Sequence, residues 1–193
     1  LSRRNYVGGM LRHLSSQGGI KDLVLDDKFY NTSLDVTYGV RERDMSWNVD
    51  LGAKNQIYNW YGLPTKSIVF DDATIAGIDS KQTYNTIALG GKMSFKDGIF
   101  TDASMQFKRF SDGLNSGENR FFIKPNFDFD VMNQKIKADF VVDYVGGSFE
   151  RMYDIDSELK YSTIIAGTKP SILYQQDDLS VQIGAGVYYA TAK

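Results

Sequence analysis

The chain has 193 residues, of which 42% are hydrophobic and 13% aromatic, and its 22 Lys and Arg nearly balance its 24 Asp and Glu. This balance excludes the basic footprint of a nucleic-acid-binding protein. The lack of cysteine excludes a disulfide scaffold and thiolate metal sites. No run of about 18 apolar residues occurs, which excludes a transmembrane helix. The length fits one domain.

Apolar and polar residues alternate with a period of two along most of the chain, which predicts β-strands with two unlike faces. The pattern is clearest after Leu179, where Val181, Ile183 and Val187 alternate with polar or small residues. We expect nine strands, with ladder interruptions at Pro125 and Pro170, which lack a donor. The predicted strands cover residues 5–14, 30–41, 45–60, 84–96, 99–110, 117–131, 134–147, 160–175 and a last segment from Leu179.

The connections between these strands alternate in length. Short turns rich in Asp, Asn and Gly are expected at residues 41–44, 96–98, 132–134 and 175–178. Longer connections are expected at residues 15–29, 62–82, 112–117 and 149–158. An antiparallel meander with short turns at one end and long loops at the other is typical of outer-membrane β-barrels. The sequence therefore predicts an all-β, antiparallel, up-and-down transmembrane β-barrel, of which the chain is a part.

Alternation alone does not distinguish a membrane barrel from a soluble one, in which the apolar face would point inward. Several strands are long enough to cross a bilayer at a tilt, and glycines fall in strand interiors, which suits a curved sheet. Aromatic residues also gather near strand ends, where they would form two interfacial girdles. The candidate girdle residues are Trp47, Tyr58, Trp60, Tyr61, Phe95 and Phe100.

The polar face is the main candidate functional surface, and we expect it to face the lumen. Its charges have both signs, so cross-strand pairing is favoured over an ion-selective ring of one sign. The candidate lumen-facing residues are Asp35, Asp50, Lys54, Lys92, Asp102, Lys108, Arg120, Lys124, Asp128, Lys135, Lys137, Asp139, Asp143 and Lys169.

No motif for catalysis or cofactor binding is present. His13 lies near Ser15 and Ser16, but no acid or Gly-x-Ser-x-Gly motif accompanies them. The acidic pairs at 26–27, 71–72 and 177–178 lack the alternate spacing of a calcium loop and suit turns. No phosphate loop or dinucleotide fingerprint occurs. We therefore predict that the protein is not an enzyme and uses no cofactor or metal.

Several phrases resemble a family of Gram-negative outer-membrane barrels often labelled TonB-dependent-receptor-like. They are DMSWNVDLG at residues 44–52, YNWYGLP at 58–64 and DYVGGSF at 143–149, with shorter matches at 18–21 and 117–121. The resemblance implies that residues 1–193 are a portion of one larger barrel domain. Neither a plug domain, a TonB box nor a signal peptide is visible, and the resemblance assigns no functional residue.

Three functions fit these expectations. The first is the barrel wall of a receptor-like or porin-like transporter in the bacterial outer membrane. The second is a non-transporting scaffold or partner subunit of an outer-membrane assembly or secretion complex. The third is a soluble β-barrel or β-sandwich binding protein. For the first two, the expected partners are outer-membrane lipid and other outer-membrane or periplasmic subunits, and no nucleic acid.

Overall fold

The computed structural model describes residues 4–64, 67–131, 134–150, 158–176 and 178–193. All predicted strands are present, with ends that differ by a few residues. The only helix in the described part of the chain is α1, Asp72–Ala76. The strands are β1 (Asn5–Ser16), β2 (Phe29–Arg41), β3 (Met45–Asn59), β4 (Lys81–Phe95), β5 (Phe100–Asp112), β6 (Gly117–Val131), β7 (Gln134–Phe149), β8 (Leu159–Gln176), β9 (Leu179–Gly184) and β10 (Val187–Ala192).

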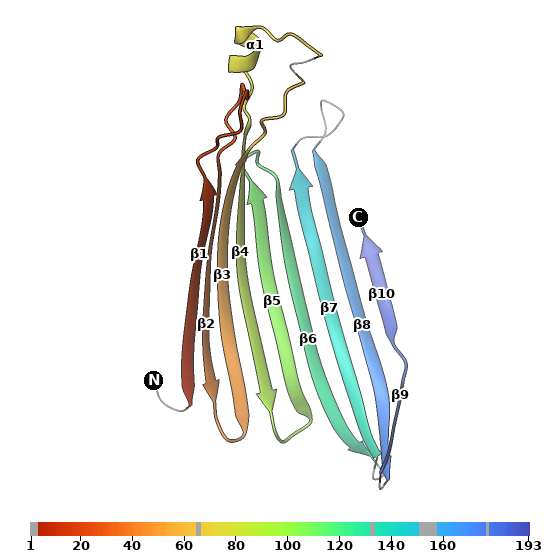
Figure 1. The fold of residues 1–193 in the computed structure, drawn as a ribbon. Helices are drawn as coiled ribbons and strands as arrows, with labels where there is room; N and C mark the ends of the chain where they lie inside the picture. Colours follow the sequence, from red (N-terminus) through yellow and green to blue (C-terminus); the bar gives the residue numbers. More distant parts are fainter. Residues whose placement is uncertain (1–3, 65–66, 132–133, 151–157, 177) are drawn as a thin grey trace.

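The strands form one antiparallel up-and-down sheet in which β1 to β8 pair in chain order (Figure 1). Both β9 and β10 pair with β8. Ser171 lies opposite Gly184, and Thr168 lies opposite Val187. The two short strands therefore follow one another along the same neighbour and correspond to the single last strand predicted from sequence.

Each of the two strand prolines, Pro125 and Pro170, coincides with a gap in the ladder on one side of its strand, as the sequence predicted. Between β6 and β7 the pairing stops after Ile123 and resumes at Asn126, so it skips Pro125. Pro170 lies at the gap that separates β9 from β10, where its carbonyl accepts a hydrogen bond from the Ala185 N–H at 3.2 Å. A further irregularity between Phe100 and Asp102 places an additional residue in β5 opposite β6.

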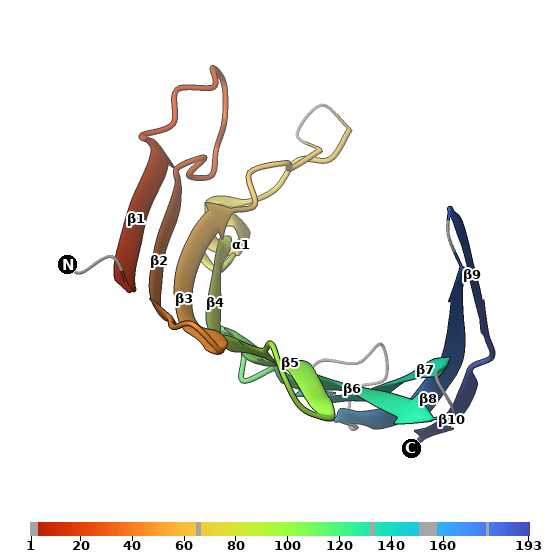
Figure 2. The same ribbon diagram turned by 90° about the horizontal axis from the view of Figure 1, so that it is seen from below.

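The sheet is a single curved layer that forms an open trough, with β1 at one edge and β9 and β10 at the other (Figure 2). Small residues line the inside of the curve, where side chains converge. One example is Gly39, directly opposite Tyr6. A Cβ at Gly39 would collide with the Tyr6 ring, so this ring can lie across the glycine only because it has no side chain.

The long connections mostly lie at one end of the trough and the short turns at the other (Figure 1). Two connections differ from the sequence prediction. The segment between β3 and β4 contains α1, whose first turn is capped by Asp71 through a 2.6 Å bond from the Thr74 N–H. The β5–β6 connection, predicted to be long, spans only residues 113–116, because the Asp112 carboxylate accepts the N–H groups of Leu114 and Ser116 and closes a tight turn.

The fold has almost no interior. In the described part of the chain, the only buried hydrophobic residue is Ala138. A sheet is normally stable when its apolar face packs against a second layer, and no such layer is present among the described residues. No described helix has the length and hydropathy needed to span a membrane.

Candidate functional site: the two faces of the sheet

The strand register separates the side chains into two faces, because cross-strand partners point to the same side. One row runs through Val36, Leu51, Leu89 and Phe107 and continues to Phe121, Tyr144 and Ile164. We call the side of this row the apolar face. The adjacent row, on the opposite side, contains Asp35, Gly52, Ala88, Lys108 and Arg120. We call that side the polar face.

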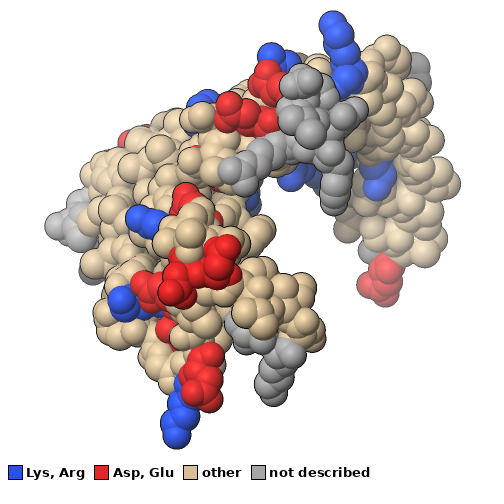
Figure 3. Space-filling view, turned by 90° about the horizontal axis from the view of Figure 1, so that it is seen from above, with Lys and Arg blue, Asp and Glu red and all other residues tan. Residues whose placement is uncertain are grey.

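The register places every candidate lumen-facing residue on the polar face. This face lines the inside of the trough. A hollow of about 720 Å³ there is lined by Arg12, Asp35, Lys54 and Thr86. A second hollow, of about 490 Å³, is lined by Asp50 among others. Seen from the loop end, charges of both signs gather over the loops and toward the trough, while the broad outer surface carries few (Figure 3).

Charges on the polar face pair across strands at three places. Arg120 contacts Asp143 through two bonds, Nε–Oδ1 at 2.9 Å and Nη2–Oδ2 at 2.6 Å. Arg12 lies 3.3 Å from Asp35, and Lys135 lies 3.5 Å from Asp128. The other candidate lysines form no ion pair with a described residue. They are Lys54, Lys92, Lys108, Lys124, Lys137 and Lys169. Cross-strand pairing therefore neutralises part of this face, and several cations stay open to solvent.

Aromatic residues cluster on the apolar face near the short turns. Of the girdle candidates, Phe95 and Phe100 pack with ring centroids 5.5 Å apart, and Trp47 packs edge-on against Tyr38 at 5.6 Å. The cluster continues through Phe127, which lies 5.4 Å from Phe100 and 5.6 Å from Phe140 between ring centroids. The sequence alone does not reveal this cluster, because only strand pairing brings the rings together.

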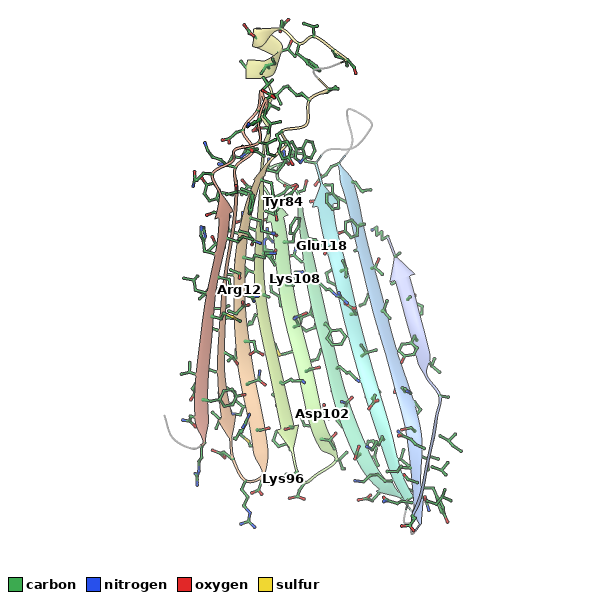
Figure 4. The ribbon with its side chains drawn as sticks, viewed as in Figure 1. Arg12, Tyr84, Lys96, Asp102, Lys108 and Glu118 are labelled. Atoms are coloured by element: carbon green, nitrogen blue, oxygen red, sulfur yellow. The ribbon has the colours of Figure 1, made fainter. Side chains whose placement is uncertain are left out.

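The remaining girdle candidates lie elsewhere. Tyr58 occupies the polar face, where its ring centroid is 6.2 Å from that of Tyr84, and Tyr84 stacks on Phe110 at 5.8 Å. Trp60 and Tyr61 lie beyond the end of β3 in the long connection, with Trp60 68% exposed. These rings form an aromatic group inside the trough at the loop end, near Tyr84 in Figure 4, which was not among the sequence predictions. Its signal was the presence of Tyr84 and Phe110 at polar-face positions.

The residues considered for catalysis and metal binding have structural partners. His13 lies on the apolar face and its Nδ1 shares a 2.8 Å hydrogen bond with Thr32. Asp26 accepts the Lys28 N–H at 3.1 Å, which lowers the pKa of its carboxyl, and the Thr74 bonds lower the pKa of Asp71. Asp177 lies outside the described residues. The described side chains form no cluster of three or more metal-ligating residues.

No protein-family model, curated protein or solved structure matches the chain.

Proposed function

We propose that the chain is a wall segment of a β-barrel in the bacterial outer membrane, belonging to a TonB-dependent-receptor-like or porin-like transporter. The observation that carries this proposal is the exposed apolar face on the outer side of a single-layer sheet. In the middle of that face Leu51 is 49% exposed and Ile87 is 53% exposed. Continuous apolar surface on this scale is rare on soluble monomers and marks a membrane or protein interface.

The height of the apolar band supports lipid as the covering medium. On β6 the apolar face is hydrophobic from Phe121 to Val131 and turns polar at Asn119. Such a stretch measures roughly 35 Å along the strand at about 3.3 Å per residue. With the tilt of about 45° usual for these strands, it spans about 25 Å, the height of the apolar band of outer-membrane barrels.

The strand directions support a larger closed barrel. Because β9 and β10 share one ladder position, the sheet has β1 and the β9–β10 pair as its two edges, and these run in the same direction (Figure 1). Joining the two edges directly would require parallel pairing. An odd number of further strands would close the sheet with antiparallel pairing throughout and give the even total that bacterial single-chain barrels have.

The polar face supports a transport role. It would line the lumen, and its unpaired lysines, such as Lys54, Lys92 and Lys108, are open to passing solute. A non-transporting scaffold is the second candidate, favoured by the charges that neutralise each other across strands, above all Arg120 and Asp143. In that case the lumen would be a sealed structural interior.

Reconstitution of the full-length protein that carries this chain tests both candidates. The protein is extracted from the membrane fraction, inserted into lipid vesicles and assayed for ion conductance and entry of small hydrophilic solutes. A transporter gives conductance or uptake, directly or with its energy-coupling partner. A sealed barrel that copurifies with a stable set of subunits favours the scaffold. Recovery in the aqueous fraction without detergent would contradict both.

A further inference from the structure

The charges on the apolar face are confined to one end and to one sign. By register, the Lys, Arg, His, Asp and Glu side chains that the described strands place on this face are His13, Lys81, Arg109 and Lys160. None of them is acidic, and all lie toward the long connections. The polar face, in contrast, carries acids and bases along its full length. This asymmetry needs an explanation beyond solubility.

The upper edge of the apolar band is a continuous polar row. The row contains His13, Thr32, Asn55 and Asn85, each of which lies opposite the next on the neighbouring strand. Asn55 donates to Asn85 at 2.7 Å. The adjacent row on these four strands is Leu11, Leu34, Ala53 and Ile87. On β1 to β4 the face therefore changes from hydrocarbon to hydrogen-bonding side chains between two neighbouring rows, at the height where lipid headgroups would begin.

Two of the cations line a common hollow at this edge. A hollow of about 640 Å³ is lined by Arg109 on β5 and Lys160 on β8, with Ser111, Asn119 and Ser148 between them. Arg109 donates to the Asn119 side-chain oxygen at 3.2 Å and forms no ion pair with a described carboxylate. Lys160 contacts Glu158 at 2.7 Å. Asp112 also borders the hollow, but its Oδ1 accepts the N–H groups of the β5–β6 turn.

We infer that this hollow binds the phosphate of an anionic membrane lipid headgroup. The inference rests on the proposed function, because it requires acyl chains along the apolar band. A lipid whose chains cover Phe121 and Tyr144 would place its phosphate beside Arg109, where the guanidinium provides two parallel donors and nearby hydroxyl and amide groups supply further ones. Lys160 places an ammonium group at the other side of the hollow, where it also contacts Glu158.

The opposite end of the sheet lacks this arrangement. Its short turns carry Arg43 beside Asp44, 4.0 Å apart, and Lys96 near Asp97. No described strand places a cation on the apolar face at that end, where rings such as Phe95 and Phe100 form the edge of the band. The headgroup contact therefore belongs to the loop end only, and it would fix the height of the barrel in the leaflet that this end enters.

The test compares lipid binding by the full-length protein and its charge variants. The protein is inserted into nanodiscs of phosphatidylcholine with a minor fraction of phosphatidylglycerol, and bound phosphatidylglycerol is counted by native mass spectrometry after release. We expect Arg109→Gln and Lys160→Gln each to weaken retention about fivefold, the effect of about 1 kcal/mol per surface cation. Glu158→Gln, which frees Lys160, should strengthen retention.

Lys108→Gln is the matched control, since Lys108 is the chain neighbour of Arg109 but points to the polar face. It should leave retention unchanged. The headgroup site would be overturned if the wild type retained phosphatidylcholine and phosphatidylglycerol equally. It would also be overturned if Lys108→Gln and Arg109→Gln lost phosphatidylglycerol equally. In both cases insertion into the membrane would still support the barrel. Failure of the wild type to insert would instead overturn the proposed function. Unchanged retention of phosphatidylglycerol by the double variant Arg109→Gln/Lys160→Gln would also reject the site.

Discussion

Arg120 on β6 and Asp143 on β7 form a two-point ion pair although they are not direct cross-strand partners. Arg120 lies opposite Val145, and Asp143 lies opposite Phe122. Arg12 with Asp35 and Lys135 with Asp128 are diagonal in the same way. The direct partner of Arg120 on its other side is the cation Lys108. The diagonal contact draws the guanidinium toward Asp143, so two like charges that face each other are tolerated.

The first prediction concerns this pair. Arg120→Ala should destabilise the sheet by about 0.5–1 kcal/mol, because the pair is partly exposed and solvent screens it. The measurement is the midpoint of urea unfolding of the full-length protein in detergent. Lys124→Ala, on the same strand and face but without an ion pair, is the control and should change the midpoint little. Equal shifts in both variants would argue that the Arg120–Asp143 contact contributes no stability.

The second prediction concerns the apolar face. Leu51→Arg places a charge in the middle of the band and should cost about 2–4 kcal/mol of membrane stability. The expected result is loss of the protein from the membrane fraction, measured by fractionation and quantitative blotting. Asp50→Arg changes the neighbouring residue on the polar face and should insert normally. If Leu51→Arg inserted as well as the wild type, this face would not contact hydrocarbon.

The third prediction concerns the packing of Tyr6 across Gly39. Gly39→Val should displace the ring and destabilise the β1–β2 pair by about 1–3 kcal/mol, the usual cost of overpacking. Tyr6→Ala should relieve most of that cost in the double variant, which a thermal melt would show as non-additivity. The control is Gly91→Ala, where the nearest atom to the new Cβ is 3.5 Å away. Additive losses would mean that the two residues do not share one packing site.

The fourth prediction concerns Glu158, which lies just outside β8. Hydrogen bonding from Lys160 lowers the pKa of its carboxyl below the ordinary value. The ion pair between Glu158 and Lys160 is therefore fully formed at a pH above the ordinary pKa of a glutamate. It is lost as the pH falls through the lowered pKa of Glu158. Lys160→Met should raise the pKa of Glu158 back toward the ordinary range, which carbon-detected NMR titration of the labelled side chain can measure. An unchanged pKa in this variant would show that Lys160 is not the cause.

The strands were the most predictable part of the molecule. Alternation is a local property, so the segment that became β6 could be recognised from its own residues. The short β5–β6 turn was not recognised, because it depends on the Asp112 side chain closing back on Ser116. The position of Tyr58 on the polar face was also missed, since aromaticity near a strand end does not reveal the parity that decides its face.

The candidate site was predictable in kind but not in detail. Period-two spacing is sufficient to assign Arg120 and Asp143 to the polar face, but their contact requires the diagonal geometry of a twisted sheet. The hollow between Arg109 and Lys160 joins strands separated by β6 and β7, so no sequence window contains it. Curvature likewise arises from many pairings together and has no single sequence signal.

The proline gaps have a mechanical consequence. The gap at Pro125 divides the hydrogen-bonded ladder between β6 and β7 into two short blocks in place of one long block. In the same way, the gap at Pro170 separates the ladder between β8 and β9 from the ladder between β8 and β10. A pulling force applied to a strand end would break each block of hydrogen bonds in a separate step. Under a pulling force, β6 should therefore separate from β7, and β8 from β9 and β10, in partial steps. The uninterrupted ladder between β3 and β4 should separate only as one unit.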